Sequence, residues 1–241
     1  MKINYKSYSI EYDYIYRNKD DTIIFLHGWG GNKYSFSFLF TYLQQYNILS
    51  ISFPPYFTSQ NYTDCFIELT LDDYKQIVNL IAKFHNITNA HIICHSFGFR
   101  VCLIITSCNF DIKKIIVTGG AGLNLKKTIL KQITLYNKII WNKKLKIFDK
   151  NLDINNLKNN DQKTFKNIIK IDLTQYANLI KCPILIFWGK QDKSTPYKVA
   201  RLLKKRTKKS KLITVDSDHF AYLKFQNKFT KEVLNFLKEK L

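Results

Sequence analysis

Apolar and polar residues follow two different periods along this chain. Between Tyr5 and Tyr16 they alternate at every second position, which predicts an antiparallel hairpin or meander at a sheet edge. Continuous apolar runs predict buried strands at 23–26, 48–53, 91–94, 114–117, 184–188 and 212–215. Helical patterns lie between or after these runs, at 35–46, 71–84, 99–105 and 228–241. Strands that alternate with helices predict an α/β fold, in which helices cover both faces of a mostly parallel sheet.

The segment 123–170 interrupts this alternation. It contains no convincing strand, and its apolar residues are mixed with many lysines. Because it lies between two predicted strands, we expect a small helical cap or lid, inserted into a core that residues 1–122 and 171–241 form. Within it we expect the Asn- and Lys-rich part at 151–167 to be a loop. A basic lid could contact an anionic membrane surface, although solvated lysines on a packed helix are the simpler interpretation.

One strand-to-helix junction carries a candidate nucleophile, Ser96. The sequence Cys94-His95-Ser96-Phe97-Gly98 follows an apolar run and precedes a helical one. A serine at such a turn adopts a strained backbone conformation that presents its hydroxyl at the carboxyl edge of the sheet. Gly98 is the small residue that this close turn needs after the serine, whereas Cys94 stands where a glycine is usual before it.

A nucleophilic serine needs a base, a group that orients the base, and an oxyanion hole. His219 follows the last predicted strand and is the candidate base. Asp192 follows the preceding strand and is the candidate acid. Asp216 and Asp218 are rivals nearer in sequence, but neighbouring side chains such as those of Asp218 and His219 rarely face each other.

The oxyanion hole has two candidate donors, the backbone N–H groups of Trp29 and Phe97. Trp29 lies in the glycine-rich turn His27-Gly28-Trp29-Gly30-Gly31, which follows a buried strand. We expect His27 to hold this turn by hydrogen bonds and His95 to be a packed polar residue. For Arg100 we expect a buried hydrogen-bonding role rather than contact with substrate.

The chain resembles the α/β-hydrolase superfamily over nearly its full length. The order Ser96, Asp192, His219 is that of this family. More narrowly, the chain resembles bacterial single-domain serine hydrolases and carboxylesterases with a His-Gly-Trp-Gly turn and a His-Ser-Phe-Gly elbow; the run at 182–192 is also typical of them. The resemblance implies an eight-stranded type of sheet with a small helical cap, and it implies the roles given above. Phe99 replaces a common second glycine, which predicts a more crowded elbow.

Hydrolysis of carboxylic esters through an acyl-enzyme is the reaction that we expect, since this triad and oxyanion hole need no metal or organic cofactor for it. The expected substrate is a small ester or acyl compound. Its pocket would include Gly28 and Phe220, together with Tyr136 and Trp141 of the cap. Two alternatives stay open: the same triad used for C–C bond hydrolysis, lyase chemistry or acyl transfer, and a non-catalytic binding protein on this scaffold.

Charge and cysteine usage limit the other classes of function. The net charge is +20, but only four of the 38 basic residues are arginines, which leaves 34 lysines. Since base readout and phosphate clamps favour arginine, we expect no specific nucleic-acid binding. The five cysteines, at 65, 94, 102, 108 and 182, show no metal-binding spacing and suit buried positions in a reducing compartment. Without a signal peptide or an apolar run long enough to span a membrane, the predicted location is the cytoplasm.

Overall fold

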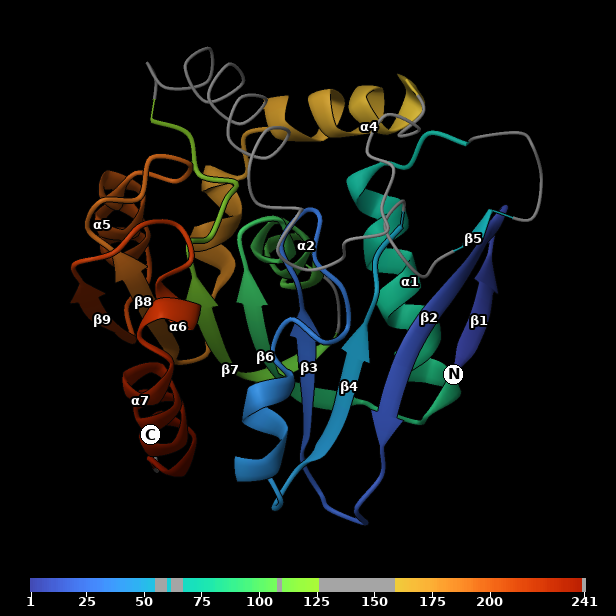
Figure 1. Cartoon of the computed structure of the whole chain (residues 1–241), viewed down its shortest axis with the longest axis horizontal. Coiled ribbons are helices and arrows are strands. Elements are labelled where there is room, and N and C mark those ends of the chain that lie inside the picture. The colour runs from blue at the N-terminus through green and yellow to red at the C-terminus, as the bar shows by residue number, and fades with distance from the viewer. Residues whose placement is uncertain (55–59, 62–66, 108–109, 126–158, 240–241) are drawn as a thin grey trace.

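A twisted sheet runs through the centre of the molecule (Figure 1). The computed structural model describes residues 1–54, 60–61, 67–107, 110–125 and 159–239. Its strands are β1 (Lys2–Tyr5), β2 (Tyr8–Ile15), β3 (Thr22–Leu26), β4 (Asn47–Ile51), β5 (Gln60–Asn61), β6 (Asn89–His95), β7 (Asp111–Thr118), β8 (Ile184–Gly189) and β9 (Ser210–Val215). Eight of them lie side by side in the order β1-β2-β4-β3-β6-β7-β8-β9, and the short β5 pairs with β2.

The sheet is antiparallel only at its N-terminal edge. β1 pairs with β2, and β2 pairs with β4 and β5, in antiparallel register. From β4 to β9 every pair is parallel, so these strands all end at the same edge of the sheet. Both the mostly parallel α/β sheet and its antiparallel edge are therefore confirmed.

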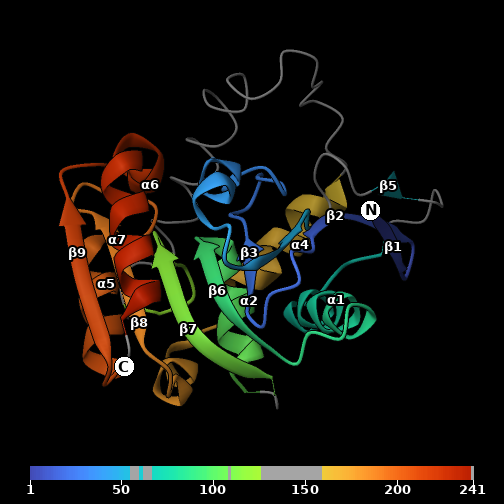
Figure 2. The ribbon, with the colours of Figure 1, turned by 90° about the horizontal axis from the view of Figure 1, so that it is seen from below.

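Helices cover both faces of this sheet, as the view from below shows (Figure 2). The helices are η1 (Ser37–Tyr42), α1 (Leu71–Phe84), α2 (Phe97–Ile105), α4 (Asn159–Lys170), η5 (Thr174–Leu179), α5 (Tyr197–Arg206), α6 (Ala221–Lys224) and α7 (Gln226–Lys238). One apolar cluster joins the sheet to α1, α2 and α5. A second cluster joins the opposite face to η1, α6 and α7.

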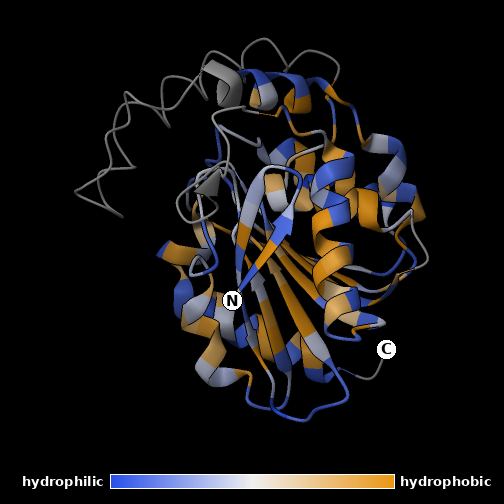
Figure 3. Ribbon diagram, turned by 90° about the vertical axis from the view of Figure 1, so that its right-hand side faces the viewer, coloured by the Kyte–Doolittle hydropathy of each residue, from blue (hydrophilic) through white to orange (hydrophobic). Residues whose placement is uncertain are grey.

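The strands divide their side chains between these two clusters by simple alternation. Ile24 and Leu26 of β3 belong to the first cluster, and Ile23 and Phe25 belong to the second. A strand that is buried on both faces needs apolar residues at every position, which accounts for the continuous runs in the sequence. Figure 3 shows the result as hydrophobic strands enclosed between amphipathic helices.

Two expectations about helices were wrong. The pattern at 35–46 predicted a full helix, but only the short 3-10 helix η1 forms there, with Leu39 as its buried residue. Its aromatic and β-branched residues, such as Phe38 and Thr41, are poor helix formers, which favours a single turn. The predicted loop at 151–167 instead contains the first part of α4, whose apolar residues Phe165, Ile168 and Ile169 have helical spacing.

α4 lies across the top of the molecule in Figure 1, at the end of the sheet toward which β4 and β6 point. α4 belongs to the segment 123–170, and the residues that flank this segment are joined, because Leu173 N–H donates to Gly122 O at 2.8 Å. Asn124 N–H likewise donates to Thr174 Oγ1 at 2.9 Å. Residues 126–158 are outside the described residues, so the cap as a separate unit stays a prediction. No helix in the described part of the chain is long and apolar enough to span a bilayer.

Candidate active site

Ser96 lies at the sharp junction between β6 and α2. Its backbone has φ 48° and ψ −110°, a left-handed conformation that residues other than glycine rarely adopt. Backbone hydrogen bonds hold it there: Ser96 N–H donates to Thr118 O at 3.2 Å, and Ala121 N–H donates to Ser96 O at 3.0 Å. Strain that the surrounding structure maintains in this way is typical of functional sites and of a nucleophile elbow.

Two glycines allow other segments to approach this junction closely. A Cβ on Gly98 would lie 2.1 Å from the carbonyl oxygen of Leu26, so the first turn of α2 lies directly against the end of β3. A Cβ on Gly28 would lie 3.3 Å from Ser96 Cβ and 2.5 Å from Nδ1 of His95. Gly28 therefore borders the serine side chain, where the sequence predicted part of the pocket.

The two unusual elbow residues are both fully buried. The thiol of Cys94 lies 3.6 Å from Ile116 O, to which it donates a weak hydrogen bond. Phe99 has room because residue 120 is a glycine, where a Cβ would lie 2.7 Å from the phenyl ring. The large side chain of Phe99 is thus accommodated by the absence of a Cβ at Gly120.

Asp192 and His219 are in direct contact at the carboxyl edge of the sheet. Nδ1 of His219 lies 2.8 Å from Oδ2 of Asp192, and both side chains are buried. Oδ1 of the same carboxylate accepts the backbone N–H groups of Ser194 and Thr195, each at 2.8 Å. The carboxylate therefore requires Nδ1 to carry a proton, and this leaves Nε2 of a neutral imidazole as the free base.

Nε2 of His219 is buried and has no hydrogen-bond partner among the described residues. The rival carboxylates are engaged elsewhere: Asp216 accepts from Gln191 at 2.8 Å, and Asp218 accepts from Phe220 N–H at 3.1 Å. Of the three candidate acids, only Asp192 has a hydrogen bond with His219 in the described structure.

Thr195 joins this pair to the end of the neighbouring strand, a contact that the sequence did not predict. Its Oγ1 lies 2.8 Å from Asp192 Oδ2, 2.9 Å from Gly119 O and 3.2 Å from His219 Nδ1. Gly119 has φ 54°, and a Cβ there would lie 3.0 Å from the imidazole. The only local signal was the turn Asp192-Lys193-Ser194-Thr195, in which an aspartate bonds to the backbone N–H groups that follow it.

His27 has the structural role that the sequence predicted. Its Nε2 accepts the N–H of Phe53 at 2.8 Å, so its proton is on Nδ1, which donates to Gly28 O at 2.7 Å. Burial lowers the pKa of His27 to about 4, against the opposing effect of the bond to Gly28, so the ring stays neutral. It ties the end of β4 to the turn that carries Trp29.

His95 is a packed polar residue, as expected, but it packs on the candidate base. Its ring lies 4.7 Å from the His219 ring, and its Nε2 lies 3.2 Å from His219 O. Burial and the neighbouring imidazole of His219 hold the pKa of His95 well below its usual value. Since Ser96 is the next residue, this contact brings the elbow and the His219 loop together.

The two residues that are predicted to supply the oxyanion donors have aromatic side chains that contact each other. The rings of Trp29 and Phe97 meet edge to face at 5.1 Å, and Phe165 of α4 lies 4.8 Å from Trp29. Phe220 lies 5.4 Å from the ring of His219. Phe165 was missing from the predicted pocket because it fell in the predicted loop. The predicted pocket residues Tyr136 and Trp141 lie outside the described residues.

Arg100 anchors α4 above this site. Its guanidinium donates to the carbonyl oxygens of Ile168, Ile169 and Ile171 at 3.1, 3.0 and 2.9 Å. These carbonyls lie at the C-terminal end of α4, where intrahelical partners are missing and a cation is favourable. The hydrogen-bonding role expected for Arg100 is confirmed, and it links the elbow helix to α4.

Metal binding has no preassembled ligand set in the part of the chain that the structure describes. No group of three or more His, Cys, Asp or Glu side chains converges there.

Comparisons with known proteins agree with this architecture. Residues 120–226 match the family model of the alpha/beta hydrolase fold. No curated protein matches the chain. An esterase from Exiguobacterium antarcticum has a similar structure, with a TM-score of 0.77, 16% identity, and 96% of each chain covered. An enol-lactonase from Burkholderia xenovorans has a TM-score of 0.79 and 14% identity, over 99% of this chain and 100% of that one. A meta-cleavage product hydrolase from Pseudomonas fluorescens has a TM-score of 0.75 and 14% identity, over 100% of this chain and 98% of that one.

Proposed function

Because this chain has the α/β-hydrolase fold, we propose that it is a serine hydrolase that cleaves carboxylic esters of small or acyl substrates. One observation carries the proposal. A buried imidazole lies at the sheet edge where Ser96 has a strained backbone; it is bonded to Asp192 through Nδ1, and its Nε2 has no hydrogen-bond partner among the described residues. Such a pair of base and orienting acid is what a serine needs to become nucleophilic.

The proposed reaction has two halves. Nε2 of His219 takes the proton of Ser96 as Oγ attacks the ester carbonyl, and the N–H groups of Trp29 and Phe97 stabilise the oxyanion. His219 then gives the proton to the departing alcohol, which leaves the acyl group on Ser96. Water attacks this acyl-enzyme while His219 removes its proton, and the acid is released as Ser96 regains a proton. Asp192 stabilises the imidazolium in both halves.

The side chains around the predicted oxyanion donors favour an apolar acyl group. Trp29, Phe97 and Phe165 form a continuous aromatic wall, because Trp29 contacts both of the other rings. Pockets with mostly aromatic and aliphatic walls, and a few polar groups, take apolar ligands. Phe220, beside His219, would border the leaving group.

A fluorophosphonate probe tests the nucleophile directly. We expect the probe to label the wild-type protein, and to fail to label Ser96→Ala. The matched control is Ser107→Ala, an exposed serine just past the same helix, which we expect to be labelled like the wild type. If the wild type stays unlabelled under conditions that label a known esterase, the alternative of a non-catalytic binding protein would replace this proposal.

A panel of p-nitrophenyl esters of increasing acyl length tests the reaction class. We expect turnover that depends on Ser96, and higher kcat/KM as the acyl chain lengthens, because the aromatic wall gains contact area. Labelling without turnover of any ester would favour the alternative reactions, which are C–C bond hydrolysis, lyase chemistry or acyl transfer on the same residues.

A further inference from the structure

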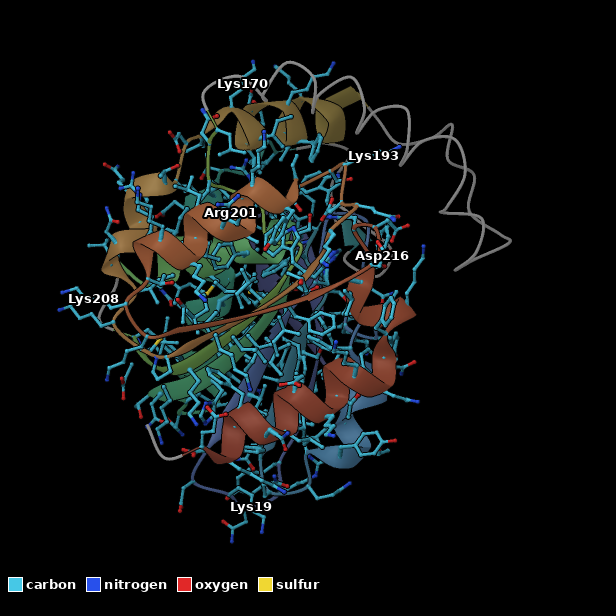
Figure 4. All side chains as sticks on the ribbon, turned by 90° about the vertical axis from the view of Figure 1, so that its left-hand side faces the viewer. Lys19, Lys170, Lys193, Arg201, Lys208 and Asp216 are labelled. Atoms are coloured by element: carbon cyan, nitrogen blue, oxygen red, sulfur yellow. The ribbon has the colours of Figure 1, made fainter. Side chains whose placement is uncertain are left out.

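Helix α5 has an outward face made of basic side chains. We define the α5 basic face as the exposed helix residues Lys198, Arg201, Lys204, Lys205 and Arg206, together with the exposed Lys208 two residues past the end of the helix. The helix contains no acidic residue, and none of these six side chains has an ion pair among the described residues. Figure 4 views this side of the molecule, with Arg201, Lys208 and the nearby Lys193 spread across it.

The arginines distinguish this face from the general excess of lysine. The chain has four arginines among its 38 basic residues. Arg17 donates to Tyr46 O at 2.9 Å, and Arg100 donates to the carbonyls of α4, so both have internal roles. The remaining two, Arg201 and Arg206, both lie on the α5 basic face. The four arginines are therefore found only in two internal hydrogen-bonding roles and on this surface. The planar guanidinium group can bind a phosphate through two parallel hydrogen bonds.

Helix stability accounts for only part of this charge. Lys204, Lys205 and Arg206 lie in the last turn, where cations favour the helix dipole. Lys198 lies in the first turn, where a cation is unfavourable. Arg201 lies three or four residues from Lys198, Lys204 and Lys205, and such like-charge pairs destabilise a helix. An external anion would relieve this repulsion.

An exposed apolar residue on an element that contacts α5 favours a lipid surface over other anions. η5 contacts α5, and its last residue, Leu179, is 47% exposed. Exposed apolar residues beside basic ones suit the interface of a bilayer. The aromatic side chains of α5 and η5, Tyr197 and Tyr176, are only partly exposed and pack against the core, whereas proteins usually bind single-stranded nucleic acid through exposed stacking aromatics.

We propose that the α5 basic face docks this protein on a bilayer that carries anionic phospholipid headgroups. Lysines supply the diffuse attraction, Arg201 and Arg206 contact headgroup phosphates, and Leu179 enters the interface. The proposal goes beyond the proposed ester hydrolysis and is independent of it, since docking needs none of Ser96, Asp192 or His219.

The test is co-sedimentation of the full chain with vesicles. We expect binding to phosphatidylcholine vesicles that contain about 30% phosphatidylglycerol, little binding to phosphatidylcholine alone, and release by salt. Arg201→Glu/Lys205→Glu should weaken the binding by roughly 30-fold or more, because each basic residue near an anionic surface accounts for about fivefold. Lys228→Glu/Lys231→Glu on α7 is the matched control, with the same change in net charge at exposed positions that have no ion pair in the described part of the chain, and it should bind like the wild type.

Circular dichroism checks that each variant is folded, and Arg201→Gln/Lys205→Gln replaces the charge reversal if that variant is not. If the α5 and α7 variants bound the anionic vesicles equally weakly, the net charge of the protein alone would account for binding, and the proposal would be overturned. So would failure of the wild type to bind the anionic vesicles at low salt. Polyglutamate or a single-stranded oligonucleotide that binds the α5 face more tightly than the vesicles do would assign it to an acidic protein or a nucleic acid instead.

Discussion

Replacement of Gly98 by alanine tests whether the elbow depends on the contact between α2 and β3. The added Cβ would lie 2.1 Å from the carbonyl oxygen of Leu26 and 2.8 Å from that of His27. Nonbonded carbon and oxygen atoms need about 3.3 Å. The first turn of α2 must therefore move away from β3 by about 1 Å, and Ser96, two residues earlier, moves with it.

The expected cost has two parts. A displacement of about 1 Å at a reacting group lowers activity by about 100-fold, so we expect this loss in kcat/KM for a p-nitrophenyl ester. Crowding of a close-packed interior costs about 1–3 kcal/mol of unfolding free energy. In a domain of this size, each kcal/mol lowers Tm by about 2–4 °C. Ester turnover, the rate of fluorophosphonate labelling and thermal unfolding measure these effects separately.

Gly31→Ala is the matched control, since it adds the same methyl group in the neighbouring glycine-rich turn. There the nearest atom is Ser35 Oγ at 2.7 Å, the end of a side chain that can rotate, and the nearest backbone atom lies at 3.1 Å. We expect kcat/KM within about threefold of the wild type. If Gly98→Ala kept wild-type activity and Tm, the close contact would not determine the geometry of the elbow, and the reasoning would be refuted.

Three further substitutions test the supporting contacts. Thr195→Val removes the hydroxyl that lies within hydrogen-bond distance of Asp192 and Gly119, and should lower kcat about tenfold, whereas Thr195→Ser should keep the wild-type kcat. Equal activity of the wild type and both variants would exclude a positioning role. Arg100→Met leaves the carbonyls at the end of α4 unpaired, and should lower the unfolding free energy by about 3 kcal/mol in urea denaturation, with a smaller loss for Arg100→Lys. Burial alone would raise the pKa of Asp73, but hydrogen bonds from Lys6 and Thr70 outweigh it and lower the pKa to about 2. The ionised carboxylate therefore stabilises the fold above about pH 4, and this stabilisation is lost as pH falls toward 2. Asp73→Asn should lower the unfolding free energy by about 1 kcal/mol at pH 7, after allowance for solvent screening, and should leave it unchanged near pH 2, as urea denaturation at the two pH values would measure.

Local pattern was sufficient for the order and type of most elements. Strands buried on both faces must be apolar throughout, so their positions were visible in the sequence without knowledge of their neighbours. α1 begins and ends where its pattern predicted, and Thr70 and Asp73 form a capping box that favours its start. The pattern at 35–46 was misleading, since a buried residue every three or four positions suits a short 3-10 turn as well as a helix.

The approximate arrangement of Ser96, Asp192 and His219 also followed from the sequence. Each residue lies two to four positions past the end of a predicted strand, and parallel strands that run in one direction end at one edge of their sheet. The choice of Asp192 over Asp216 and Asp218 agrees with the 2.8 Å contact that the structure contains. Their catalytic roles stay a prediction, for which the labelling of Ser96 is the test.

Contacts between segments far apart in the chain were decided only by the tertiary structure. Thr195 reaches Gly119, His95 packs on His219, Arg100 binds the end of α4, and Gly120 makes room for Phe99. None of these pairs has a sequence period or motif that relates its members, because each depends on how two strands or helices approach each other in space. Periodicity in a sequence reports which face of an element is buried; the partner that buries it is selected by packing of the whole chain.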